Sequence, residues 1–134
     1  MASTHPYFDD RGLKWHTKLA DALAEAKRDK KHVLIEYGRL ACGNCKALVE
    51  NVMPHSTVKP ILEQKFVLLA SDCDHPEEEV RKIGAHHMAN ARSLPFVMFL
   101  NSNGNFVFGT QGARDPHTFA HDLLHGGEDA GHHH

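Results

Sequence analysis

The stretch that decides the fold, residues 33–45, reads VLIEYGRLACGNC. Its first five residues are apolar except for Glu36 and include β-branched and aromatic side chains, a pattern typical of a buried strand. After a short connection over residues 38–41, Cys42 and Cys45 begin a segment whose apolar residues recur at helical spacing. The sequence therefore predicts a strand, a turn and then a helix that carries a Cys-x-x-Cys pair in its first turn.

The location of the two cysteines indicates redox chemistry. A helix start offers unpaired backbone N–H groups and a partial positive charge, so we expect it to stabilise a thiolate at Cys42 and to lower the pKa of that thiol from about 8.5. Cys42 is thus the expected nucleophile. Cys45 lies one turn further into the helix, where we expect it to be shielded from solvent and to resolve a mixed disulfide formed by Cys42.

The same spacing could instead be half of a zinc site. Zinc usually takes four Cys or His ligands, and the sequence holds no second Cys-x-x-Cys. Cys73 could supply only a third ligand. We therefore expect no metal, and we assign no other cofactor.

The composition is that of one ordinary globular domain. The chain has 134 residues, 15 Lys and Arg against 17 Asp and Glu, and three cysteines, which are too few for a framework of several disulfides. Basic residues are scattered, so nucleic acid is not an expected partner.

No apolar run approaches the roughly 20 residues of a membrane span, and no leader is visible. We expect a monomer in the cytoplasm, or in the periplasm or secretory pathway if the sequence is the mature part of an exported protein.

The rest of the chain predicts alternating helices and strands. Apolar residues at three- and four-residue steps predict an amphipathic helix over about 14–30 that begins before Trp15. With the strand described above, three more predicted strands give an α/β fold with a central mixed four-stranded sheet and helices on both faces. These strands cover residues 66–70, 96–100 and 106–108. We divide the chain into an N-terminal extension, 1–13, a domain, 14–125, and a tail, 126–134, whose closing histidines resemble a purification tag.

Four segments in register resemble the thioredoxin superfamily. They are the strand 33–37, the motif Cys42-Gly-Asn-Cys45-Lys46, the segment Arg92-Ser93-Leu94-Pro95-Phe96, and Gly112. In order, they resemble its central strand, active-site motif, cis-proline loop and the glycine that flanks the substrate groove. The resemblance extends from about Trp15 to Leu124. It implies a compact thioredoxin-like fold and thiol–disulfide exchange on protein disulfides, with Cys42 and Cys45 as the redox-active disulfide and an upstream reductase or thiol donor as a second partner.

The resemblance also implies roles for other residues. Glu36 matches the family's buried acid, which would accept the proton of Cys45, and burial would raise its pKa towards the working pH of a general base. Alternatively, the twist of the strand lets Glu36 reach water. The substrate-binding residues that the resemblance implies are Gly43, Asn44, Leu94, Pro95 in the cis form, and Gly112.

Two positions depart from the family pattern. Ala41 stands where the family usually has Trp, which leaves the choice of partner open. Asn44 carries no positive charge, so we expect a milder stabilisation of the thiolate than His would give, and a reductant or general exchange catalyst rather than a strong oxidant. Cys73 is expected to be a bystander thiol at the same edge of the sheet. The alternative function is a non-catalytic binding or chaperone module with a redox-sensitive cysteine pair.

Overall fold

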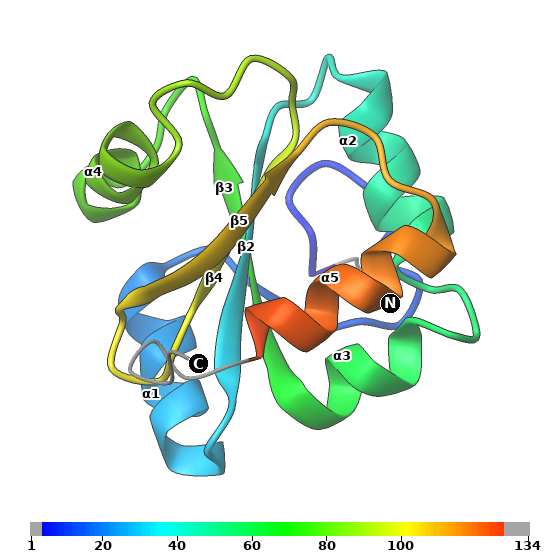
Figure 1. Cartoon of the computed structure of the whole chain (residues 1–134), viewed down its shortest axis with the longest axis horizontal. Helices are drawn as coiled ribbons and strands as arrows, with labels where there is room; N and C mark the ends of the chain where they lie inside the picture. Colours follow the sequence, from blue (N-terminus) through cyan, green and yellow to red (C-terminus); the bar gives the residue numbers. More distant parts are fainter. Residues whose placement is uncertain (1–3, 128–134) are drawn as a thin grey trace.

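The predicted central strand is β2, His32–Gly38, and it lies in the middle of the sheet. The computed structural model describes residues 4–127. Here β2 pairs in parallel with β3 (Phe66–Asp72) and antiparallel with β4 (Phe96–Leu100), and β4 pairs antiparallel with β5 (Phe106–Gln111). These four strands and their mixed pairing confirm the predicted sheet (Figure 1).

The sheet also has a fifth strand that the sequence did not predict. This strand, β1 (Trp15–His16), pairs in parallel with β3 at the edge, and the strand order is β1-β3-β2-β4-β5. The prediction of a helix from about residue 14 is therefore wrong at its start. Lys18 has an extended backbone, with φ −125° and ψ 129°, and helix α1 covers only Leu19–Asp29.

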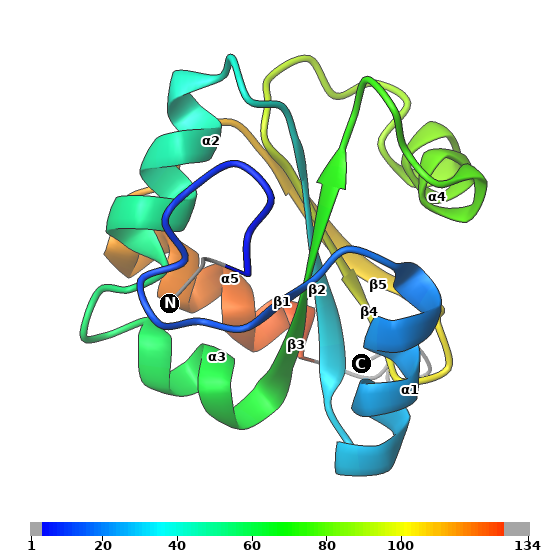
Figure 2. The same cartoon turned by 180° about the vertical axis from the view of Figure 1, so that it is seen from behind.

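Helices cover both faces of the sheet (Figures 1 and 2). Side chains alternate along β2, so Val33 and Ile35 pack against one helical layer and Leu34 packs against the other. Glu36 follows Leu34 by two residues and points to the same layer as Leu34. The layer beside Val33 contains α1 and α4 (Glu78–His87), and the layer beside Leu34 contains α2 (Gly43–Ala47), the π-helical turn η1 (Leu48–Val52), α3 (Lys59–Lys65) and α5 (Pro116–Gly126).

Residues 4–13, here called the N-terminal segment, pack on the same face as α2 (Figure 2). Three of their side chains are buried, namely His5, Phe8 and Leu13. The described part of the predicted extension therefore contributes to the core of the domain. The predicted tail falls mostly on residues 128–134, which lie outside the described residues, and α5 itself continues to Gly126.

Gly126 in α5 leaves room for the buried ring of Phe99. A Cβ on residue 126 would overlap that ring. We therefore expect Gly126→Ala to lower the free energy of unfolding by about 1–3 kcal/mol through overpacking, although Ala normally favours a helix over Gly by about 1 kcal/mol. Denaturant unfolding measures the change. Gly43→Ala is the matched control, because a Cβ at Gly43 meets nothing within 4 Å, and equal effects of the two substitutions would contradict the prediction.

Candidate active site

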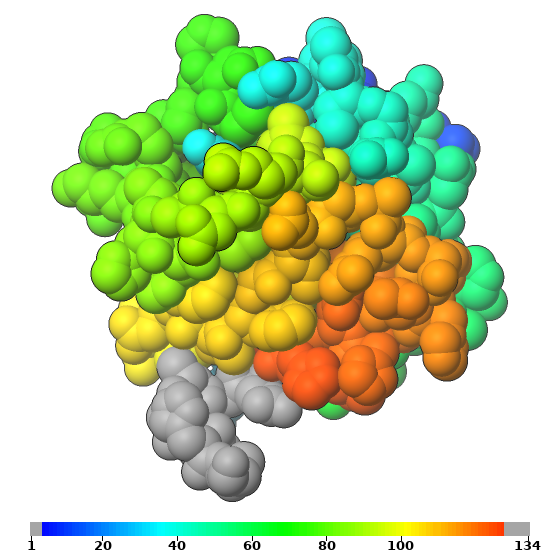
Figure 3. Space-filling model, turned by 45° about the horizontal axis from the view of Figure 1, so that its top comes forward, coloured from blue at the N-terminus to red at the C-terminus, as the bar shows by residue number. Residues whose placement is uncertain are grey.

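Three segments that are far apart in the sequence meet at one edge of the sheet. Parallel pairing places Gly38, at the end of β2, opposite Asp72 at the end of β3. Antiparallel pairing places Tyr37 beside Phe96, the first residue of β4, and Phe96 beside Gln111, the last residue of β5. The loop after β2, the loop before β4 and the residues after β5 therefore share this edge. Figure 3 shows their surfaces, in cyan, yellow-green and amber, next to one another.

The two cysteines of the motif lie where the first of these loops enters α2. Cys42 is the residue that caps the helix, and its Sγ accepts the backbone N–H of Cys45 at 3.1 Å. A disulfide joins the two residues, whose Cα atoms are 5.3 Å apart. Cys42 is half-buried and Cys45 is fully buried, so an incoming partner meets the sulfur of Cys42 first.

Glu36 lies near the sulfur of Cys45 and does not reach solvent, since it is only 2% exposed. A Cβ on Gly38 would lie 2.6 Å from both Glu36 Oε2 and Cys45 Sγ. The carboxyl oxygen and the sulfur therefore border the same small space, which stays open because residue 38 is a glycine. Burial raises the pKa of Glu36 above its ordinary value, while a hydrogen bond with His5 acts in the opposite direction.

His5 is the site residue that sequence reasoning missed. Its Nε2 lies 2.8 Å from Glu36 Oε1, and both side chains are buried. His5 falls in the predicted N-terminal extension, 1–13, which was expected to lie outside the domain. A usable signal was nevertheless present, because the aromatic residues Tyr7 and Phe8 follow it closely and a cluster of this kind favours burial.

The loop before β4 is fixed against the end of β5. The peptide bond between Leu94 and Pro95 is cis, as the resemblance implies. Gly112, with φ +78°, donates its backbone N–H to the carbonyls of Ser93 and Pro95 at 2.9 and 3.0 Å. The Gln111 side chain accepts the backbone N–H groups of Ser93 and its predecessor at 3.0 and 2.8 Å. The structure thus places three of the predicted substrate-binding residues at the edge that carries the cysteines.

The surface around Cys42 is partly apolar. Gly43 and Asn44, the other two predicted substrate-binding residues, are exposed in the first turn of α2. Ala41 is exposed as well, and Leu40 is 63% exposed although it is a large apolar side chain. An apolar side chain next to a reactive sulfur can contact an apolar residue of a partner.

Cys73 is a free, half-buried cysteine at the same edge. Its backbone N–H donates to Gly38 O at 2.7 Å, and Arg39 Nη2 donates to its Sγ at 3.2 Å. Asp72 and Asp74 flank it, and the three side chains offer ligand atoms within 4.8 Å of one another. Arg39 also forms an ion pair with Asp74 at 3.0 Å, so this cluster is already neutralised in part and we assign no metal to it.

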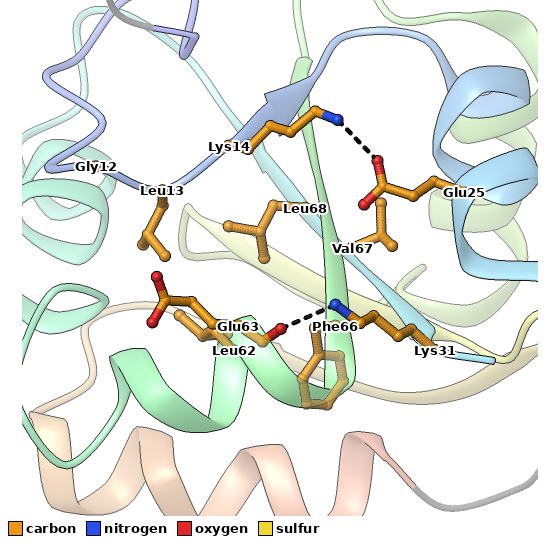
Figure 4. Close-up of a pocket in the computed structure, with 10 residues that line it drawn as sticks. All are labelled: Gly12, Leu13, Lys14, Glu25, Lys31, Leu62, Glu63, Phe66, Val67 and Leu68. Atoms are coloured by element: carbon orange, nitrogen blue, oxygen red, sulfur yellow. Dashed lines mark hydrogen bonds and ion pairs between the residues drawn. The ribbon is translucent and has the colours of Figure 1, made fainter. Parts of the chain in front are cut away.

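A hollow of about 180 Å³ lies elsewhere, and Figure 4 shows the side chains that line it. Two polar contacts join residues of its lining, the ion pair of Lys14 and Glu25 at 3.1 Å and the hydrogen bond from Lys31 to the Glu63 carbonyl at 2.9 Å. Neither Glu36 nor a cysteine belongs to its lining, so the hollow is separate from the candidate site. Among the described residues, moreover, no helix has the length and apolar character needed to cross a membrane.

Known structures share this fold. A thioredoxin from Thermus thermophilus is similar, with a TM-score of 0.70 and 22% identity over 91% of this chain and 98% of that chain. A disulphide isomerase from Xylella fastidiosa Temecula1 has a TM-score of 0.64 and 19% identity over 79% and 86% of the two chains. The C-terminal domain of DsbD from Neisseria meningitidis has a TM-score of 0.59 and 16% identity over 79% and 91%. At these identities the likeness shows the fold.

A comparison of the sequence with models of protein families identifies the family to which the chain belongs. No match was found among curated proteins. The model of a family described as thioredoxin-like, however, matches residues 14–102, which include β1 to β4 and both cysteines of the motif. The fold, the Cys42–Cys45 disulfide and this match agree, and the chain belongs to the thioredoxin-like family.

Proposed function

We propose that this protein is a thiol–disulfide oxidoreductase that reduces or exchanges protein disulfides through Cys42 and Cys45. One observation carries the proposal. A half-buried cysteine at a helix start is joined to a buried cysteine, and a buried carboxyl lies beside the second sulfur. Structural disulfides do not need such a carboxyl, whereas exchange needs a group that can take up a proton.

The proposed reaction proceeds through a mixed disulfide. In the reduced protein, the thiolate of Cys42 attacks one sulfur of the substrate disulfide, forms a bond with it and releases the other sulfur as a thiolate. Cys45 then attacks the sulfur of Cys42, which releases the second substrate thiolate and forms the Cys42–Cys45 disulfide. The substrate gains two electrons and the cysteine pair loses two. A thiol donor or an upstream reductase restores the pair.

Glu36 supplies the proton acceptor for the second attack. Cys45 is buried and cannot pass its proton directly to water, while Glu36 Oε2 borders the same space as its Sγ. Because burial raises the pKa of Glu36, this carboxylate is a better base near neutral pH than an exposed one.

The local charges favour the reducing direction. Asn44 brings no positive charge to the first turn of α2, and the Cys42 thiolate is supported by the helix start and by the backbone N–H of Cys45. Because its thiolate is only moderately stabilised, the reduced pair gives up its two electrons readily, which suits a reductant and a cytoplasmic site of action.

The proposed substrate is a protein segment in extended conformation. The backbone of Leu94, before the cis proline, would pair with it, and the exposed side chain of Leu40 would contact an apolar residue near the substrate disulfide. Reduction of insulin disulfides with dithiothreitol as electron source tests the proposal. We expect many turnovers per protein molecule. A rate equal to that of dithiothreitol alone would instead favour a non-catalytic binding module.

The roles of the three cysteines can be separated by single substitutions. Cys42→Ser should abolish insulin reduction, because the attacking thiolate is lost. Cys45→Ser should accumulate mixed disulfides with the substrate, since the first attack remains and the resolving thiol is missing. Mass spectrometry under non-reducing conditions measures these adducts. Cys73→Ser is the matched control and should keep turnover within about twofold of the wild type. Full activity of Cys42→Ser, or a large loss in Cys73→Ser, would overturn these assignments.

Glu36→Gln keeps the shape of the side chain and removes the base. We expect resolution of the mixed disulfide to slow by about 10²-fold while the first attack by Cys42 is little changed, a loss typical of a missing general base. Single-turnover measurements separate the two steps. A resolution rate equal to that of the wild type would show that another group takes the proton.

Stability should respond to the same substitution in a pH-dependent way. Because burial raises the pKa of Glu36, the folded protein keeps a proton that the unfolded chain releases above about pH 4.3. The wild type therefore loses stability as the pH rises from this value through the pKa of the folded state, and Glu36→Gln lacks this loss. The free energy of unfolding of Glu36→Gln, measured with denaturant, should therefore gain on that of the wild type from pH 4 to pH 8. A difference between the two proteins that stays constant with pH would contradict a raised pKa of Glu36.

A further inference from the structure

Glu36 has a hydrogen-bond partner that comes from outside the region matched by the family. The match begins at residue 14, whereas His5 belongs to the N-terminal segment. The contact between His5 Nε2 and Glu36 Oε1 measures 2.8 Å, and the two side chains are 0% and 3% exposed. A buried polar contact of this kind needs a physical reason, because burial of two ionisable groups is costly.

The second ring nitrogen of His5 determines where its proton lies. The backbone N–H groups of Tyr7 and Phe8 both donate to Nδ1, each at 3.2 Å. Nδ1 therefore acts as an acceptor and carries no proton, which leaves the proton of the neutral ring on Nε2. An imidazolium would direct an Nδ1–H towards these two donors. His5 is thus held as a neutral ring whose Nε2–H donates to Glu36.

This bond distinguishes the two oxygens of the Glu36 carboxyl. Oε1 accepts the proton of His5, and Oε2 borders the space shared with Cys45 Sγ. The donor at Oε1 fixes the rotation of the carboxyl group. It also supports the ionised form of Glu36, which is the form able to take up a proton.

The packing of the N-terminal segment holds the imidazole ring in place. The ring stacks on Phe8 with a centroid distance of 5.1 Å, and the edge of Trp15 meets it at 4.9 Å. The backbone N–H of Thr4 donates to Asp10 at 2.6 Å, and the Thr4 hydroxyl accepts the backbone N–H of Trp15 at 3.0 Å. His5 is therefore held by the segment on one side and by β1 on the other.

The other titratable groups near Glu36 act differently. Asp72, at the end of β3, raises the pKa of Glu36 by charge repulsion. Tyr7 donates its hydroxyl to Asp72, and this hydrogen bond lowers the pKa of Asp72. From α2, the facing group is the sulfur of Cys45. Of these neighbours, His5 is the hydrogen-bond donor that supports a charged Glu36.

We propose that His5 is a positioning residue for disulfide exchange, whose Nε2–H holds Glu36 Oε1 so that Oε2 receives the proton of Cys45. The proposal rests on the proposed function and extends it to a residue of the N-terminal segment. When Cys45 attacks the sulfur of Cys42, its proton passes from Sγ to Glu36 Oε2. His5 keeps its own proton throughout.

Two substitutions separate the donor from the rest of the ring. The amide nitrogen of Gln reaches the place of the ring Nε2, so His5→Gln keeps a donor for Glu36 and loses the acceptor at Nδ1. The amide oxygen of Asn reaches the place of Nδ1, so His5→Asn keeps the acceptor for the backbone N–H groups of Tyr7 and Phe8 and loses the donor. Both variants remove a similar ring volume, so they are matched in packing.

The readouts are the pH profile of mixed-disulfide resolution and the carboxyl ¹³C titration of Glu36 in the reduced protein. We expect His5→Asn to move both midpoints up by about one to two pH units and to slow resolution near pH 7 by about tenfold or more, since the carboxylate loses a hydrogen bond. His5→Gln should keep both midpoints within about 0.5 units of the wild type. Alkylation of Cys42 should proceed at the same rate in all three proteins.

The controls distinguish a positioning role from a structural one. Leu13→Ala removes a buried side chain from the N-terminal segment and leaves the rings that pack on His5 in place, so it should lower the unfolding midpoint and leave the pH midpoints unchanged. Equal shifts in His5→Gln and His5→Asn, or no shift in either, would overturn the proposal. If the wild type fails to reduce insulin disulfides, the proposed function fails, while the Glu36 titration still decides whether His5 supports the carboxylate.

Discussion

The carboxyl group of Glu36 is almost fully buried between an apolar sheet and a disulfide, where a charge is costly unless hydrogen bonds support it. Three neighbours define the surroundings of this carboxyl group. His5 donates to one carboxyl oxygen, Gly38 leaves space beside the other, and Cys45 is the neighbour across that space. The fold, the N-terminal segment and the cysteine motif are therefore linked through a single side chain.

Strand periodicity decides which face of the sheet receives this carboxyl. Leu34 and Glu36 point to the layer with α2 and the N-terminal segment, whereas Val33 and Ile35 point to the layer with α1 and α4. A shift of one residue along β2 would turn the carboxyl away from the cysteines. The register of β2 with its two neighbours, which fixes Gly38 opposite Asp72 and Tyr37 opposite Phe96, is thus a condition for the proposed chemistry.

Local patterns predicted the parts of the structure that depend on neighbouring residues. The strand around Glu36 and the helix that begins at Cys42 follow from the order of apolar residues, and the resemblance to thioredoxins supplied the cis form of Pro95. Long-range contacts were not visible in this way. The spacing of Trp15 also fits a helix, and only its pairing with β3 makes it part of a strand. His5 was missed because its partner lies 31 residues further along the chain.

Cys42 and Cys45 are proposed to form a working redox pair, in which a helix start and the backbone N–H of Cys45 stabilise the Cys42 thiolate. The most direct test is the reduction potential of this pair, measured by equilibration with glutathione buffers. We expect a reversible two-electron couple near the value of thioredoxin, about −270 mV. A potential near that of a strong oxidant of this chemistry, about −120 mV, or a pair that does not equilibrate, would contradict it.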